Sequence, residues 1–178
     1  DARAAGCLSG RLEGLAHTAD NLRRCLLAPL GRCDLFIYAP ADAHSHLAER
    51  LRPTVLEVAP DRPLPEGGLE NDVNCRLKTG VQGYLQQLHG LKMCNRLRLD
   101  YERRQGIRYD WVVRCRPDLL FEAPLPDPQA LDLSYLHLPD FHTYEGANDR
   151  FAIGNPQNMT TYMEKFDAVH HYVRRWAT

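Results

Sequence analysis

Short apolar runs alternate along the chain with longer segments in which apolar residues recur at helical spacing. Runs of roughly four to eight apolar residues bounded by glycine or proline are typical of strands buried on both faces. The segment Asp34–Tyr38 (DLFIY), between Gly31 and Pro40, is the clearest case. The pattern predicts strands at residues 4–9, 34–38, 54–58, 111–115, 133–138 and 151–153.

The segments between these strands carry helical periodicity. Gly90 is a candidate break within the longest of them. Asn155 followed by Pro156 is a typical N-cap and first helical position, so the last helix should begin there and continue as one helix through Val173. The predicted helices cover residues 17–30, 43–51, 73–105 and 155–173.

This order of strands and helices predicts the fold class: an α/β domain of three layers, with a mostly parallel open sheet and helices on both faces. A chain of 178 residues can bury one sizeable core, so we expect a single domain over residues 1–178. Residues 60–72 are dense in proline, glycine and charge. We expect them to form a flexible loop that is long enough to cover a site.

Composition excludes some classes of partner. The chain is 44% hydrophobic and 25% charged, which is ordinary for a globular domain. Its net charge of -1 provides no overall basic field, so we expect no nucleic-acid partner. No stretch approaches the roughly 20 apolar residues that cross a bilayer, so we expect no membrane span within the chain.

The localisation stays open between a secretory, Golgi-like lumen and the cytoplasm. The chain starts at Asp1 rather than Met, which suggests truncation at the N-terminus, and an anchor could lie upstream. Its 6 cysteines are even in number, which keeps disulfides open, but no spacing with each other or with histidine is typical of a zinc site. Residues 158–160 (NMT) match the glycosylation sequon.

The strand at 111–115 ends in a charged tip that suggests a ligand site. Arg114, Arg116 and Asp118 alternate along the sequence, so on a strand they would point the same way. Pro117 lacks an amide hydrogen and should end the strand there. Ligands of open α/β sheets bind beyond the carboxyl ends of strands, so this tip could hold an anion or a metal-bound anion. The alternative is an ion pair between Arg116 and Asp118 that caps the sheet edge.

A second polar cluster, Asn148-Asp149-Arg150, runs directly into the strand at 151–153. Together with LSGR at 8–11, CDLFIY at 33–38 and YDWVVRCRPDLLF at 109–121, the segment NDRFAIG at 148–154 resembles nucleotide-sugar-dependent glycosyltransferases of the GT-A type. The resemblance covers nearly the whole chain. Each motif is short, and their order and spacing carry most of the similarity.

The resemblance implies a site for a nucleotide diphosphate. In GT-A enzymes a strand ends in an Asp-x-Asp-like element that holds a divalent cation against the donor diphosphate. The matching element here is Arg116-Pro117-Asp118 (RPD), in which Asp118 fits the second carboxylate and would bind Mn²⁺ or Mg²⁺. Arg116 replaces the first carboxylate, so Arg116, with Arg114 or Arg11, could supply the positive charge directly.

The resemblance assigns the remaining site residues as follows. Gly10 and Arg11 would contact the donor after the first strand, although a glycine turn with a solvated arginine is an equal alternative. Asp149 would accept the proton of the acceptor hydroxyl, unless it pairs with Arg150 instead. Glu145 is an alternative base. The acceptor pocket would contain His142, Tyr144 and Asn148.

The expected function is therefore a glycosyltransferase that moves a sugar from a nucleotide-sugar donor to a hydroxyl of a glycan, lipid or protein. One alternative is a non-catalytic relative that binds nucleotide or carbohydrate and has lost its metal site. Another is a transferase that uses a different phosphorylated donor. The motifs GxSxG, GxxxxGKS and GxGxxG do not occur, so hydrolase, P-loop and dinucleotide-binding functions lose their usual support.

Overall fold

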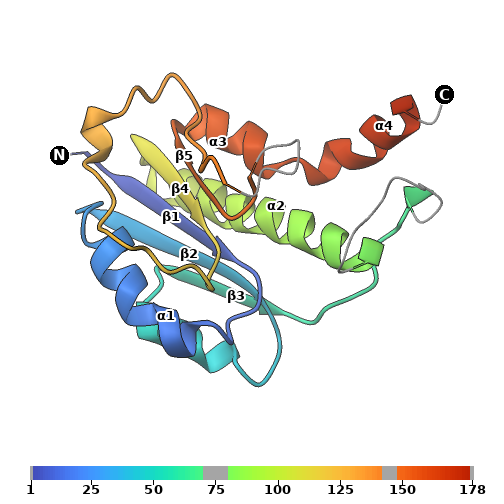
Figure 1. Cartoon of the computed structure of the whole chain (residues 1–178), viewed down its shortest axis with the longest axis horizontal. Coiled ribbons are helices and arrows are strands. Elements are labelled where there is room, and N and C mark those ends of the chain that lie inside the picture. The colour runs from blue at the N-terminus through green and yellow to red at the C-terminus, as the bar shows by residue number, and fades with distance from the viewer. Residues whose placement is uncertain (1, 70–79, 142–147, 177–178) are drawn as a thin grey trace.

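The computed structural model describes residues 2–69, 80–141 and 148–176, and these form an α/β domain around a five-stranded sheet (Figure 1). The strand order is β3-β2-β1-β4-β5. The first four strands in the chain run parallel, and β5 is antiparallel to β4. The predicted mostly parallel sheet is therefore confirmed. The strands are β1 (Ala4–Ser9), β2 (Cys33–Pro40), β3 (Val55–Ala59), β4 (Trp111–Cys115) and β5 (Phe151–Gly154).

Helices cover both faces of the sheet (Figure 1). On one face lie α1 (Leu15–Asn21), its π-helical continuation (Leu22–Leu27) and a 3₁₀ segment (Ser45–Leu51). On the other face lie α2 (Gly80–Gln105), α3 (Pro156–Met163) and α4 (Phe166–Trp176). The third predicted layer is thus present, and the segment predicted as a helix at 43–51 is a 3₁₀ helix.

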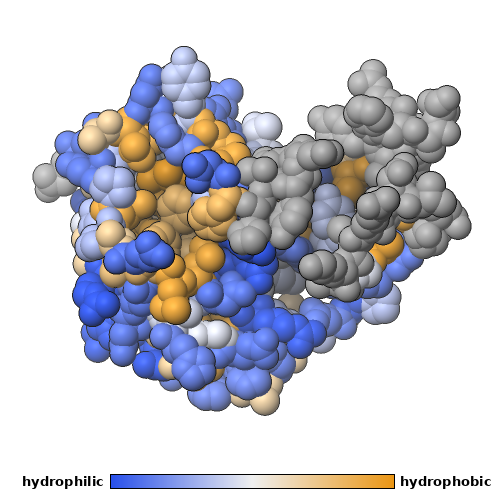
Figure 2. Space-filling model, viewed as in Figure 1, coloured by the Kyte–Doolittle hydropathy of each residue, from blue (hydrophilic) through white to orange (hydrophobic). Residues whose placement is uncertain are grey.

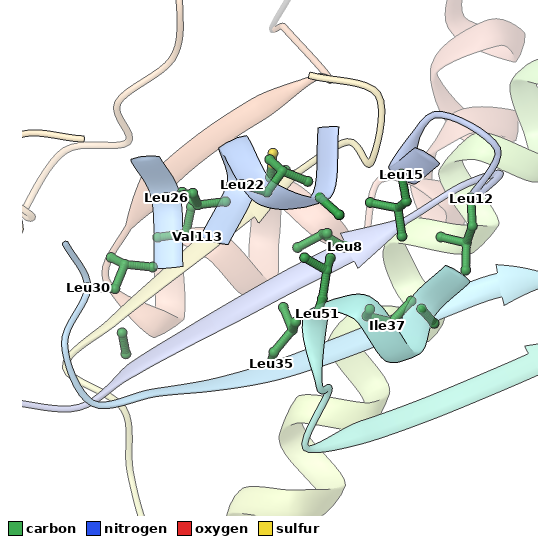
Figure 3. Close-up of a cluster of buried hydrophobic side chains, with 14 of the residues drawn as sticks. Leu8, Leu12, Leu15, Leu22, Leu26, Leu30, Leu35, Ile37, Leu51 and Val113 are labelled. Carbon is green, nitrogen blue, oxygen red and sulfur yellow. The ribbon is translucent and has the colours of Figure 1, made fainter. Parts of the chain in front are cut away.

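The central strand β1 is buried along its whole length, because helices cover it on both sides. Ala4 and Leu8 pack into the core under α1, whereas Ala5 and Cys7 pack against α2. Figure 3 shows the first of these cores, where Leu8 meets aliphatic side chains from α1, its continuation and β2. The small side chains of β1 let the helical layers approach the sheet closely.

The segment after β4 also covers the α1 face. Over residues 116–141, the one helical element is a short 3₁₀ turn (Pro128–Ala130). In Figure 2, apolar side chains gather where the segment crosses the sheet. The apolar side chains of this segment that pack on the core are Leu119, Phe121, Leu125, Leu131 and Leu133.

Two predicted elements differ from the structure in this region and at the C-terminus. Residues 133–138 form no strand but contribute one bridge, in which His137 and Ile153 exchange hydrogen bonds of 2.8 and 3.0 Å. A turn held by the Asp132 carboxylate starts this segment and limits its pairing. The last helix is split after Met163, where Glu164 leaves the helical conformation (φ -92°, ψ 18°).

Gly90 does not break α2, which is continuous over its described length. Gly90 is buried against Ser9 of β1, and a Cβ at this position would lie 3.6 Å from the Ser9 side chain. Gly90 therefore lies within the contact between the helix and the sheet, which has room for a methyl group, and it causes no change of direction.

The described part of the predicted loop at 60–72 is irregular and makes hydrogen bonds to α2. The Gln82 side chain accepts from Leu64 N at 3.0 Å and donates to Leu64 O at 2.7 Å. Gln86 donates to Arg62 O at 2.5 Å. These bonds tie residues 62–64 to the first turns of α2, and the flexibility of residues 60–72 stays a prediction.

Among the described residues, no helix combines the length and the apolar character that a membrane span requires.

Replacing Gly90 by Ala should raise the free energy of unfolding by about 0.5–1 kcal/mol, because alanine favours the helical backbone over glycine. The new methyl group would reach only ordinary van der Waals contact with Ser9. Urea unfolding followed by circular dichroism measures the change. A loss of stability would mean that the contact between α2 and β1 has no room for a methyl group.

Candidate functional site

Three polar segments meet at the carboxyl edge of the parallel strands. Gly10 follows β1, and its amide donates to Tyr38 O at 3.3 Å. Arg116 follows β4, and its amide donates to Arg150 O at 2.9 Å. Because β5 is antiparallel, its first residues lie at the same edge as the last residues of β4. The structure thus brings together the polar clusters that the sequence separates by about thirty residues or more.

Arg116 and Asp118 form a two-point ion pair. Arg116 Nε lies 2.9 Å from Asp118 Oδ1, and Nη2 lies 2.7 Å from Oδ2. The pair is partly exposed, with side-chain exposures of 34% and 50%. Burial acts to raise the pKa of Asp118, but the hydrogen bonds and charge of Arg116 outweigh it and lower that pKa. The ion pair that the sequence left as an alternative is therefore present.

The tip of β4 is held against the start of α1. Thr18 Oγ1 donates to Pro117 O at 2.5 Å. A Cβ at Gly14 would lie only 2.9 Å from Asp118 Cβ and 3.0 Å from its Cα. Glycine at this position therefore allows the turn before α1 to contact the Asp118 backbone directly.

Arg114 lies beneath this edge and does not share the position of Arg116 and Asp118, contrary to the expectation. Its register partner on β1 is Cys7, so its side chain faces the α2 layer, where it is 1% exposed. Arg116 lies beyond the end of the strand, and Pro117 turns the chain outward. The alternation of side chains between the two faces of a strand therefore does not extend to Arg116.

Among the described residues, the buried guanidinium of Arg114 donates hydrogen bonds only to backbone oxygens. It donates to Cys115 O and, at 3.4 Å, to Ser9 O. Its Nε has no hydrogen-bond partner in the part of the chain that the structure describes. A cation in this position carries a desolvation cost that no carboxylate of the described residues offsets by a salt bridge.

A second buried arginine on the same side of the sheet is fully paired. Arg98 of α2 is also 1% exposed, and its Nη1 lies 2.6 Å from Glu102 Oε2. It donates as well to Asn95 Oδ1 and, at 2.7 Å, to Thr160 Oγ1. This network links α2 to α3. The contrast shows that the fold can supply a carboxylate to a buried arginine, yet Arg114 has none among the described residues.

Asn148 orders the turn before β5. It is 2% exposed, its Nδ2 donates to Phe141 O at 2.6 Å, and its Oδ1 accepts from the Arg150 amide at 2.8 Å. Its backbone oxygen accepts from the hydroxyl of Tyr162 in α3. Asn148 was expected to contact an acceptor; in the structure its side chain holds the Asp149 backbone in place.

Asp149 is partly buried at the centre of this turn. Within the described residues it makes no ion pair, so the alternative of an Asp149–Arg150 pair is not observed. Its charge acts on Arg116, where it helps to raise the pKa, and on Lys165, where it opposes the lowering of the pKa. The geometry leaves this carboxylate available to a ligand.

Lys165 is a site residue that the sequence did not indicate. It follows the break after α3, and its Nζ lies 4.1 Å from the centroid of the Tyr162 ring. Burial lowers the pKa of Lys165, and the nearby charge of Arg114 lowers it further. The expectation of one continuous helix over 155–173 gave no reason to place this residue near Asp149. A lone lysine between the apolar positions Met163 and Phe166 was the available signal.

The remaining predicted site residues are placed as follows. Gly10 has φ 123°, a backbone conformation that favours glycine. Arg11 is exposed and lies 4.0 Å from the Asp61 carboxylate, at the start of the 60–69 segment. Arg11 therefore borders the edge without entering the cluster. The other three predicted residues, His142, Tyr144 and Glu145, lie outside the described residues.

No disulfide joins the five cysteines that the structure describes, and Cys75 lies outside them. Over the same residues, no three His, Cys, Asp or Glu side chains gather as metal ligands. Asn158 of the sequon lies in the first turn of α3, and its Nδ2 donates to Ser134 O at 2.9 Å.

A cavity of about 460 Å³ opens at the opposite, amino edge of the sheet. Its walls include Leu30, Arg32, Trp111 and Asp127. None of the residues predicted for the site borders it. The carboxyl edge, and not this cavity, is therefore where the candidate chemistry of the chain gathers.

The chain belongs to a protein family described as a domain of unknown function (DUF7796), whose model matches residues 1–172. A search of curated proteins finds no match.

Replacing Gly14 by Ala should lower the free energy of unfolding by about 1–3 kcal/mol, because the methyl group would overlap backbone atoms of Asp118 that cannot rotate away. Glu13→Ala in the same turn is the control and should change stability by less than about 0.5 kcal/mol, because Glu13 is exposed. Urea unfolding compares the two variants. Equal stability would show that the tip of β4 can move away from α1.

Proposed function

We propose that the chain is a glycosyltransferase that binds a nucleotide-sugar donor at the carboxyl edge of the sheet. The convergence of Gly10, the Arg116–Asp118 pair and Asp149 at this edge is the observation that carries the proposal. Open α/β sheets bind ligands at this edge. The resemblance to GT-A enzymes names a diphosphate as the ligand, and the local excess of arginine suits an anion.

In this proposal Arg116 contacts the diphosphate and Asp118 orients Arg116. A guanidinium has five N–H donors, and the ion pair engages Nε and Nη2. The donors on Nη1 make no hydrogen bond to the described residues and could meet phosphate oxygens. A positive charge held in place stabilises the negative charge that develops on a departing diphosphate.

A divalent cation at Asp118 fits this geometry poorly. Both carboxylate oxygens of Asp118 already accept hydrogen bonds from Arg116. A metal would have to displace the guanidinium that stands where GT-A enzymes have their first carboxylate. The proposed chemistry therefore includes no catalytic step through Mn²⁺ or Mg²⁺.

Asp149 is the proposed general base. It projects from a turn that Asn148 holds rigid, and it makes no ion pair among the described residues. A carboxylate in this position can accept the proton of an acceptor hydroxyl as the hydroxyl oxygen attacks the sugar carbon of the donor. The acceptor would be a glycan, lipid or protein, and its predicted contacts His142, Tyr144 and Glu145 lie outside the described residues.

One observation favours a second function, a non-catalytic relative that binds nucleotide or carbohydrate. Arg116 and Asp118 neutralise each other's charge, as expected if the end of β4 has lost its metal site. Both functions predict nucleotide binding, and only the first predicts turnover of the donor.

A thermal-shift screen of nucleoside diphosphates tests the proposal, run once with Mn²⁺ and once with EDTA. We expect at least one nucleotide to raise the midpoint in EDTA, because protein cations meet the diphosphate. The corresponding nucleotide sugar should then be hydrolysed slowly in the absence of an acceptor. No shift with any nucleotide under either condition would remove the donor site, and binding without hydrolysis would favour the non-catalytic function.

Replacing Asp118 by Asn should reduce donor turnover by about a hundredfold or more, because Arg116 loses the charge that orients it. Stability should fall by less than about 1 kcal/mol, since the ion pair is partly exposed. Asp100→Asn, which breaks the surface pair of Asp100 and Arg103 at 3.0 Å, is the matched control and should keep full turnover. Full activity in Asp118→Asn would exclude Asp118 from the site.

A further inference from the structure

Two cations without a carboxylate partner lie on the inner side of the Asn148–Arg150 turn. Arg114 reaches this position from β4 and Lys165 from the break between α3 and α4. The charge of Arg114 influences the pKa of Tyr162, and Lys165 lies against the Tyr162 ring. Tyr162 therefore lies at the centre of the cluster. In the described part of the chain, neither cation makes an ion pair.

Each cation has a counterpart in the same layer that is paired, which provides an internal comparison. Arg98 and Arg114 are both 1% exposed, but only Arg98 has a carboxylate, at 2.6 Å. Lys92 and Lys165 both lie over an aromatic ring, at 5.9 and 4.1 Å from its centroid, but only Lys92 has a carboxylate, at 2.5 Å.

An unpaired buried cation is costly, so its presence needs a physical reason. Asp149 is the carboxylate whose charge reaches Lys165, and it balances at most one of the two positive charges. Arg116 and Asp118 neutralise each other, so they do not supply a second negative charge. Counting the described residues, the cluster of Arg114, Lys165 and Asp149 therefore has an excess of positive charge in a poorly solvated position.

From this comparison, we propose that Lys165 and Arg114 form an anion subsite that accepts the diphosphate of the donor, with Lys165 as the contact residue and Arg114 as the buried charge behind it. This inference rests on the proposed function for the identity of the anion. The charge that GT-A enzymes take from a metal would come here from the inner side of the sheet edge, opposite the Arg116–Asp118 pair.

The geometry suits a phosphate better than a carboxylate. Lys165 is a compact charge at the rim of the cluster, and the Tyr162 ring beneath it limits how far it can fold inward. Two positive charges from different elements match a group that carries two or more negative charges. Arg114 Nε is buried and has no hydrogen-bond partner in the described structure, so part of the positive charge behind Lys165 is uncompensated there.

Calorimetric titration of the whole chain in EDTA with inorganic pyrophosphate tests the contact residue. Lys165→Met should bind pyrophosphate about tenfold to a hundredfold more weakly than the wild type, as expected for the loss of one charge-assisted hydrogen bond. Lys165→Arg should retain most of the affinity. Lys92→Met is the matched control and should bind as the wild type does. Equal affinities of wild type and Lys165→Met, or no binding by the wild type, overturn the inference.

A second pair of variants separates binding from a structural role for the buried arginine. Arg114→Met should keep or raise the urea midpoint of unfolding while weakening pyrophosphate binding, because it removes an unpaired charge. Arg98→Met should lower the midpoint, because it leaves Glu102 without its partner. An Arg114→Met variant that folds and binds pyrophosphate as the wild type does overturns the role of Arg114. If this variant does not fold, Lys165→Met decides the inference.

The same titrations separate this inference from the proposed function. Inorganic phosphate, pyrophosphate and a nucleoside diphosphate are compared, and tighter binding of the nucleotide identifies it as the source of the anion. Pyrophosphate binding that depends on Lys165, without turnover of any nucleotide sugar, would support the subsite and remove the transferase. Turnover that is unchanged in Lys165→Met would retain the transferase and remove the subsite.

Discussion

Burial of the central strand β1 between two helical layers is the constraint on which the rest of the structure depends. Every residue of this strand is buried, and its neighbours β2 and β4 satisfy its backbone hydrogen bonds. Small residues along β1 let α2 approach so closely that Gly90 packs against Ser9. The position of α2 in turn sets where α3 and α4 lie, and therefore which side chains reach the carboxyl edge of the sheet.

The same burial decides how far each charged side chain near the carboxyl edge is exposed to water. Arg116 has passed the end of its strand, so it is partly solvated and pairs with Asp118 at little cost. Arg114 stands two residues earlier on a strand that is covered by helices, so it is removed from water. One strand tip therefore presents two arginines in different environments. In the proposed site, the first would contact the ligand from an exposed position, and the second would add a positive field from within.

Much of the fold could be predicted because its signals are local. The apolar run Asp34–Tyr38 and the Asn155-Pro156 cap each depend on neighbouring residues, and both lie in the expected elements. The position of Gly90 inside a continuous helix could not be predicted in the same way, because its contact is with Ser9, more than eighty residues away. Residues 133–138 alternate like a strand, yet a turn at Asp132 and the lack of a longer partner limit them to one bridge.

The sequence by itself determined the class of fold and the three polar segments that meet at the sheet edge, because hydrophobic periodicity and strand ends are properties of short stretches. Only the tertiary structure decided how these charges lie relative to groups on other elements. Whether Arg98 of α2 reaches Thr160 of α3, and whether Arg116 and Lys165 lie near Asp149, depend on how separate elements pack together. Electrostatic energies change steeply over distances of a few ångströms, and no local pattern of residues encodes them.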